Sequence, residues 1–225
     1  MKILIYGAGV LGSYLAHALI RGGNDVTILA RGKRINELKN NGIVIRHYFQ
    51  LKTTIDKVNV ISTLQPEDTY DIIFVVMQYQ QSQTVLPVIS NNKSKNIVFV
   101  GNNPNVHSFQ DYLNKNSGDQ KQVAFGFQAS GGRRENGRII TVRAGGSMDI
   151  GVLDGELSWS SLIEKAFKNA KYKLNFNDNI DAWLKSHMIF VLVLAYVTHA
   201  CNGNFRKADR KRWRIKWLKH WMKDI

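Results

Sequence analysis

At 225 residues, 44% of them hydrophobic, the chain is long enough to bury a substantial core, and its composition is that of an ordinary soluble protein. The single cysteine, Cys201, excludes an internal disulfide framework and indicates a reducing compartment, so we expect a cytoplasmic protein. The formal net charge of +14, from 31 basic and 17 acidic residues, favours an anionic partner of some kind.

Strands and helices alternate along the first hundred residues, which predicts a parallel sheet with crossover helices. The expected strands at 2–6, 25–30, 71–76 and 96–100 are nearly all apolar, as strands buried on both faces should be. A helix with apolar periodicity, at about 11–21, separates the first two and should end at Gly22 and Gly23. The predicted fold class is therefore α/β, a Rossmann-type, doubly wound and mostly parallel sheet.

A second set of elements follows with a different pattern. Short runs at 122–128, 138–143 and 148–152 are joined by glycine-rich turns and predict an antiparallel meander on the far edge of the sheet. A helix near 158–169, a short strand at 173–176 and a long helix at about 180–200 come next. We divide the chain into a dinucleotide-binding domain at 1–176 and an incomplete helical part at 177–225.

The long helix contains the longest apolar run of the chain, 188–197. A bilayer span needs about 20 apolar residues, so this run is too short and is better explained as part of a buried helix. We therefore expect no transmembrane segment.

The stretch YGAGVLGSYLA at 6–16 contains three glycines at positions that a dinucleotide site requires. Gly7 permits a tight turn out of the strand, Gly9 lets the backbone approach a pyrophosphate, and Gly12 lets helix and strand pack closely. The phosphates would then lie at the positive end of the helix. A tight structural turn without a ligand is the alternative, but a strand before, a helix after and a second strand favour dinucleotide binding.

The residues after the second strand indicate which dinucleotide binds. NAD sites, and most FAD sites, place a carboxylate about 20 residues past the glycines, where it binds ribose hydroxyls. This chain has LARGKR instead, with Arg31 followed by Lys33 and Arg34. A guanidinium here can hold the 2′-phosphate of NADP by charge-assisted hydrogen bonds, so we predict NADP. The alternative is three solvated surface charges.

With these residues in view, the stretch 1–34 resembles the ketopantoate reductase family, NADP-dependent enzymes that reduce a small 2-keto acid. The resemblance extends over about 1–205. It implies that Gln78, in VVMQYQQ, stands near the cofactor, that Asn102, in FVGNNPN, lies near the nicotinamide and the substrate, and that Gly132 lies against the cofactor. It also implies that Lys185, in AWLKSH, matches the catalytic lysine of the family.

Physical chemistry supports the same role for Lys185 independently. The residues that follow it in the helix are apolar, so its ammonium should be partly desolvated yet close to the mouth of a cleft. Such a lysine can protonate or stabilise the oxygen that becomes negative when a hydride reaches the adjacent carbon. A solvated or snorkelling lysine is the alternative. His187 is a second candidate for the acid, although two residues along a helix it faces elsewhere.

Several positions depart from the family pattern. Gln78 replaces a lysine and so removes a positive charge beside cofactor and substrate. Ile189 and Val193 stand where the family has asparagines that face the substrate, and an apolar helix face cannot orient a polar keto acid in the same way. Asn202, in CNGN, matches a later family asparagine within one residue and is expected to bind substrate, although Asn-Gly is also a good helix stop.

The family continues into an all-helical second domain, and we interpret this chain as having a truncated form of it. The last 20 residues are basic, with Trp213, Trp217 and Trp221 every four residues, which predicts a basic amphipathic helix. It is a surface-binding helix for anionic lipid or a partner, a nucleic-acid contact, or a truncated or frame-altered end. We favour the last and expect no nucleic-acid partner.

The leading functional hypothesis is an NADP-dependent reductase that converts ketopantoate to pantoate, with Lys185 as the acid. A homodimer is one way in which its cleft could be closed. The alternative is a protein or sensor that binds NADP without turnover, and a third hypothesis is membrane or nucleic-acid association through the tail.

Overall fold

The computed structural model describes residues 1–141 and 146–203. The chain divides into two compact units, Met1–Leu184 and Lys185–Ile225, and the division falls within the last helix, α6 (Ile180–Ala200). The division into a dinucleotide-binding domain at 1–176 and a helical part at 177–225 stays a prediction. The tail tryptophans Trp213, Trp217 and Trp221 lie outside the described residues.

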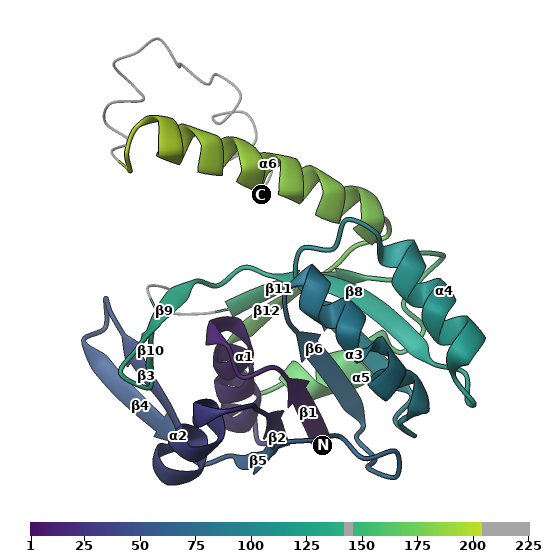
Figure 1. Ribbon diagram of the computed structural model, residues 1–225, viewed down its shortest axis with the longest axis horizontal. Helices are drawn as coiled ribbons and strands as arrows, with labels where there is room; N and C mark the ends of the chain where they lie inside the picture. Colours follow the sequence, from purple (N-terminus) through teal and green to yellow (C-terminus); the bar gives the residue numbers. More distant parts are fainter. Residues whose placement is uncertain (142–145, 204–225) are drawn as a thin grey trace. The chain divides into compact units, whose positions relative to one another are not determined.

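The first unit is built on a large, mostly parallel sheet (Figure 1). All neighbours from β8 to β5 pair in parallel, β11 pairs antiparallel with β8, and β12 pairs in parallel with β11. The strand order is β12 (Tyr172–Phe176), β11 (Gly146–Gly151), β8 (Gln122–Gln128), β7 (Asn96–Val100), β6 (Ile72–Val76), β1 (Lys2–Tyr6), β2 (Asp25–Leu29) and β5 (Asn59–Ile61). The predicted α/β class is confirmed, and the strands expected at 2–6, 96–100 and 122–128 have those bounds.

Helices cover both faces of this sheet. One face packs α1 (Val10–Arg21) and α5 (Ser160–Phe167), and the other packs α3 (Tyr79–Asn91) and α4 (Val106–Asn116). Alternate residues of β1 enter the two cores, since Ile3 and Ile5 belong to one and Leu4 to the other. Strands with both faces covered must be apolar throughout, which is why these runs were recognisable in the sequence.

The chain reverses its direction of travel across the sheet between β1 and β6. It runs from β1 outward to β2 and β5, and then returns to β6 on the other side of β1 before continuing to β7 and β8. Ligands of open α/β sheets bind at the carboxyl ends of the strands at such a switch point. The loops after β1 and β6 are therefore the place to look for a dinucleotide.

A second, smaller sheet corrects the predicted antiparallel meander. The strand expected at 138–143 is β10 (Arg138–Thr141), which lies between β9 (Gly132–Glu135) and β3 (Ile43–His47), with β4 (Lys52–Asp56) on the outside. β10 pairs in parallel with β3, and Ile139 stands opposite Ile45 in the core beside α1. β8 pairs antiparallel with β11 directly, because the strand predicted between them lies in the smaller sheet, where Ile139 is buried. Residues 142–145 lie outside the described part of the chain.

A buried ion-pair network joins α1 to this second sheet. The Asp56 carboxylate has a side chain only 4% exposed, and its oxygens lie 2.6 Å from Arg21 Nε and 2.5 Å from His17 Nδ1. Burial alone would raise the pKa of Asp56, but hydrogen bonds and charge from His17 and Arg21 together hold that pKa below its ordinary value. Burial, followed by the charge of His17, lowers the pKa of His47, whose ring centre lies 5.5 Å from that of His17.

We expect the free energy of unfolding to fall in two steps as the pH decreases. His47 has a lowered folded-state pKa, so it destabilises the fold as the pH drops below about 6.5, its unfolded value. The stabilisation from Asp56 is present above about 3.9 and is lost as the pH falls through the lower folded-state pKa. Replacing Asp56→Asn should remove the lower step and cost about 1–2 kcal/mol near neutral pH, because His17 and the half-exposed Arg21 lose a charged hydrogen-bond acceptor.

Urea unfolding across this pH range measures both steps. His47→Gln is the matched control, since it should remove the upper step and leave the lower one. An Asp56→Asn protein as stable as its parent near neutral pH would show that the network contributes nothing.

α6 differs from the expected buried helix, because most of its apolar side chains are exposed. Of its large hydrophobic residues, Ile180, Leu184 and Val197 are buried, whereas Ile189, Leu192, Val193, Leu194 and Tyr196 are exposed. Among the helices that the structure describes, α6 is long and apolar enough to cross a membrane. Core helices of soluble proteins meet the same criterion, and the absence of a membrane span stays a prediction.

Candidate functional site

The glycine turn after β1 is built by two close backbone approaches. Gly7 has a φ of +125°, and a Cβ on it would lie 2.4 Å from the carbonyl oxygen of Val76, at the end of β6. A Cβ on Gly12 would lie 2.0 Å from the carbonyl oxygen of Gly7. These two glycines therefore hold β1, β6 and α1 closer together than any other residue type permits.

Gly9 differs from the other two, because nothing in the described structure lies within 4 Å of a Cβ built on it. Gly9 is the N-cap of α1, no side chain caps this helix end, and its first turn contains no acidic residue. The first N–H groups of a helix have no partner within the helix, and together with the helix dipole they attract anions. An exposed, uncapped helix start at the switch point fits the pyrophosphate of a dinucleotide.

Two exposed cations follow β2, beside the start of α2 (Lys33–Asn41). The guanidinium of Arg31 donates to the hydroxyl of Tyr6, the last residue of β1, at a distance of 3.4 Å. Lys33 opens α2, whose first turn contains no acidic residue. A helix start flanked by Arg31 and Lys33 is suited to a second phosphate group.

Arg34 is engaged within the protein and so differs from its two neighbours. Its side chain is buried, and Nη1 donates to Gly137 O at 2.6 Å and to Glu37 Oε2 at 2.9 Å, while Nη2 donates to Ser13 Oγ at 3.2 Å. These bonds join α2, α1 and the β9–β10 turn. Arg34 therefore supports the site from within, and for this residue the alternative of a solvated surface charge is wrong.

Two predicted amide side chains lie at the carboxyl ends of adjacent strands. Gln78 is the exposed N-cap of α3, two residues after β6, and Asn102 is exposed two residues after β7. β6 and β7 pair in parallel, so both residues stand at the edge of the sheet that carries the glycine turn. The structure therefore brings Gln78 and Asn102 to the carboxyl ends of the parallel strands, where Gly7 and Gly9 also lie.

Sequence reasoning missed two buried amides at the same edge. Asn103 Oδ1 accepts from the N–H of Asn105, and its Nδ2 has no hydrogen-bond partner in the described structure. Gln128, at the end of β8, donates from Nε2 to Leu11 O in the first turn of α1 at 3.3 Å. Asn103 follows Asn102 within FVGNNPN, but burial and contacts, rather than pattern, distinguish Asn103 and Gln128 from their neighbours.

Gly132, the remaining predicted residue of the first unit, begins β9 in the smaller sheet. A Cβ on it would lie 2.3 Å from the carbonyl oxygen of Ile140, so its small size is required by the pairing of β9 with β10. This contact explains the glycine without a cofactor. Its place beside a cofactor stays a prediction.

The predicted acid and one predicted substrate ligand lie far apart along α6. Lys185 is exposed in the second turn of the helix, and Asn202, with a φ of +50°, follows its last turn. Fifteen residues of helix between Lys185 and Ala200 correspond to about 22 Å. The structure therefore does not bring Asn202 to Lys185 at a distance that one small keto acid could bridge.

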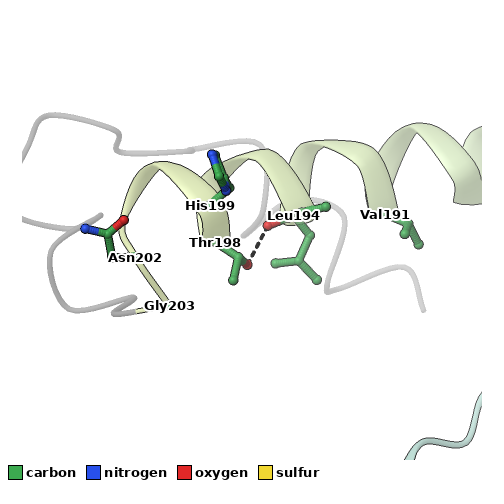
Figure 2. A pocket seen from close by; sticks show the side chains of 7 residues that line it. Val191, Leu194, Thr198, His199, Asn202 and Gly203 are labelled. Carbon is green, nitrogen blue, oxygen red and sulfur yellow. Dashed lines mark hydrogen bonds between the residues drawn. The ribbon is translucent and has the colours of Figure 1, made fainter.

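Asn202 instead lines an open hollow at the far end of α6 (Figure 2). Thr198 Oγ1 donates to Leu194 O at 2.7 Å within the helix, as the dashed line in Figure 2 shows. The hollow is lined by Val191, Leu194, Ala195, Thr198, His199, Asn202 and Gly203. Lys185 is not among these residues, so the hollow is separate from the predicted acid.

Known proteins resemble this chain over most of its length. The family model described as ketopantoate reductase PanE/ApbA matches residues 3–155. The 2-dehydropantoate 2-reductase of Pyrococcus horikoshii is 26% identical over 190 residues, which cover 81% of this chain and 58% of the relative. The chain thus spans less than two thirds of that relative, and Lys185 lies beyond the residues matched by the family model.

Two solved structures share the fold. The crystal structure of 2-dehydropantoate 2-reductase from Porphyromonas gingivalis W83 has a TM-score of 0.76 and 16% identity, covering 94% of this chain and 76% of that one. The ternary structure of D-mandelate dehydrogenase with NADH and anilino(oxo)acetate has a TM-score of 0.66 and 21% identity, covering 80% of this chain and 58% of that one.

Proposed function

The chain belongs to the ketopantoate reductase family, and on that premise we propose that it is an NADP-dependent reductase of a small 2-keto acid. The observation that carries the proposal is the open, uncapped start of α1 at Gly9, together with a β2 end that offers Arg31 and Lys33 where an NAD site has a carboxylate. The family match and these residues support one another, because the match includes the whole glycine turn.

The residues of the first unit fit a dinucleotide that carries a 2′-phosphate. The N–H groups at the start of α1 would bind the pyrophosphate, and Arg31 with Lys33 would bind the 2′-phosphate. Gln78, Asn102 and Gly132 are proposed beside the cofactor on the strength of the resemblance. Of these, Gln78 and Asn102 share the sheet edge of the glycine turn, which supports their inclusion.

The bound cofactor supplies a hydride to the carbonyl carbon of the keto acid. As that carbon is reduced, the carbonyl oxygen gains negative charge and needs a proton. We assign this proton transfer to the ammonium of Lys185, and assign the hydrogen bonding of the substrate to the exposed amide of Asn102. Asn202 is left out of this site because α6 separates it from Lys185.

The names of two relatives bear on the class of substrate. The relative from Pyrococcus horikoshii is named for 2-dehydropantoate, and the structure of D-mandelate dehydrogenase holds an oxo acid with NADH. Both names point to the 2-oxo acid class, and ketopantoate is the first substrate to test. A cytoplasmic location and a homodimer are part of the same proposal.

Replacing Arg31→Ala is expected to weaken NADPH binding by about 10- to 100-fold and to leave NADH binding nearly unchanged, because only NADPH has the phosphate that the guanidinium holds. Isothermal titration calorimetry with each cofactor measures both affinities. Lys39→Ala is the matched control, since it removes an exposed charge from the last turn of the same helix α2. Equal losses for both cofactors would contradict the assignment of the 2′-phosphate.

A second candidate function is a protein that binds NADP without turning it over. The apolar residues Ile189 and Val193 at positions where the family has substrate-facing asparagines favour it. The loss of NADPH absorbance with a panel of 2-keto acids distinguishes the two candidates. Calorimetric NADPH binding without any turnover would support the second, and no binding would contradict both.

A further inference from the structure

One side of α6 carries Lys185 and a row of exposed apolar side chains. Ile189, Leu192, Val193 and Tyr196 follow Lys185 by four, seven, eight and eleven residues, and these spacings return to the same side of an α-helix. Their exposed fractions are 65%, 69%, 46% and 62%. These four side chains are called the α6 stripe below.

The end of the stripe nearest Lys185 offers a ligand no hydrogen-bonding side chain. Ile189 lies about 6 Å along the helix axis from Lys185, Leu192 about 10 Å and Val193 about 12 Å. The Tyr196 hydroxyl, the first polar group of the stripe, belongs to a residue about 16 Å away, beyond the length of a small keto acid. A molecule whose carbonyl oxygen meets Lys185 and whose side chain extends along the stripe therefore has aliphatic carbon beside that side chain.

Such a surface discriminates between substrates by their side chains. A hydroxyl that leaves water for an aliphatic surface gives up hydrogen bonds that Ile189 and Val193 cannot replace. A methyl group at the same place instead gains from leaving water. The stripe therefore favours an apolar substrate over the same molecule with a hydroxyl added.

We propose that the preferred substrates are 2-keto acids with a wholly apolar side chain, and that Ile189 and Val193 are the residues that set this preference. The inference rests on the proposed function, because it takes Lys185 as the group that contacts the carbonyl oxygen. It changes the expected substrate within the 2-keto acids and leaves the reaction as proposed.

A matched pair of substrates tests the preference. Ketopantoate and 3,3-dimethyl-2-oxobutanoate have the same carbon skeleton and differ by one hydroxyl. We expect kcat/KM to be about 10-fold or more higher for 3,3-dimethyl-2-oxobutanoate. Ile189→Asn should lower this ratio by about 10-fold, since an amide restores a partner for the hydroxyl. Val193→Asn should have a smaller effect, because Val193 lies farther from Lys185.

Leu194→Asn is the matched control. Leu194 lies nine residues after Lys185, on the opposite side of the helix, and lines the hollow of Figure 2. This substitution introduces the same amide into α6 and should leave the substrate ratio unchanged. A ratio that responds equally to Leu194→Asn and Ile189→Asn would overturn the assignment of the stripe.

Binding measured without turnover separates this inference from the proposed function. Calorimetric titration of the NADP⁺ complex with each keto acid gives a dissociation constant for a complex that cannot react, and the same preference is expected there. Turnover with ketopantoate preferred would overturn the inference and leave the proposed function standing. Preferential binding of the apolar acid without any turnover with NADPH would do the reverse, and binding of neither acid would contradict both.

Discussion

Replacing Lys185→Ala is expected to lower the turnover of a 2-keto acid by about 10²- to 10⁴-fold, the usual contribution of a positioned proton donor. NADPH affinity should stay unchanged, because the pyrophosphate and 2′-phosphate contacts assigned to α1 and Arg31 do not involve this residue. Single-turnover measurement of NADPH oxidation at saturating cofactor reports the chemical step directly. Calorimetry with NADPH verifies that binding is preserved.

His187→Ala is the control for this experiment. His187 is the other residue near the start of α6 that can donate a proton, but two residues along a helix it lies on a different side from Lys185. Its replacement should change turnover by less than about threefold. If His187→Ala removed turnover and Lys185→Ala did not, the assignment of the acid would be wrong.

Gly9→Asp should abolish the binding of both NADPH and NADH, with affinities lowered by about 100-fold or more, and yet leave the fold intact. An aspartate at this N-cap has open space for its side chain, and its carboxylate can accept hydrogen bonds from the N–H groups of α1. It would thus stabilise the helix slightly while placing a negative charge where the pyrophosphate must lie. Calorimetry measures the loss of binding, and thermal unfolding should show an equal or higher midpoint.

Gly12→Ala provides the contrast, because its Cβ would lie 2.0 Å from the carbonyl oxygen of Gly7. This clash involves the backbone and cannot be relieved by a rotamer change, so a loss of about 1–3 kcal/mol in stability is expected. Substitutions at two glycines of one motif should therefore have different effects: Gly9→Asp removes cofactor binding, and Gly12→Ala lowers the stability of the fold. A Gly9→Asp protein that binds NADPH normally would contradict the whole dinucleotide site.

The strands of the large sheet could be predicted because burial on both faces leaves a continuous apolar run. β6 is buried along its whole length, and β7 at all but its first residue. The helix α2, in contrast, has the sequence KRINELKNN and buries only Arg34 and Leu38. A helix with so few buried apolar residues has no clear periodicity, so it could not be recognised from the sequence.

The second sheet could not be predicted because its central pair is non-local. Ile45 and Ile139 stand opposite each other although they are separated by more than 90 residues, and hydrophobic pattern alone does not say which strands pair. The predicted meander joined strands that are neighbours in sequence. Tertiary packing beside α1 decided otherwise.

Some residues of the candidate site could be selected from the sequence pattern, whereas others are recognised only from their packing. Gly7, Gly9, Gly12 and Arg31 follow a motif whose spacing has a physical cause, so the sequence alone is enough to select them. Arg34 belongs to the same basic run as Arg31, but its burial between Ser13 and Gly137 is a matter of packing. Three neighbouring cations therefore differ in burial, since Arg31 and Lys33 are exposed and Arg34 is buried, and spacing alone could not separate them.

The contacts of Arg34 constrain any attempt to redesign coenzyme preference in this protein. Exchanging Arg31 and Lys33 for neutral or acidic residues alters two surface positions and should convert an NADPH binder toward NADH at little structural expense. A broader exchange that includes Arg34 would break the hydrogen bonds that join α1, α2 and the β9–β10 turn. The variant would then lose folded protein, and its weaker cofactor binding would be mistaken for a change in coenzyme preference. Engineered variants should keep this arginine fixed while its neighbours are varied.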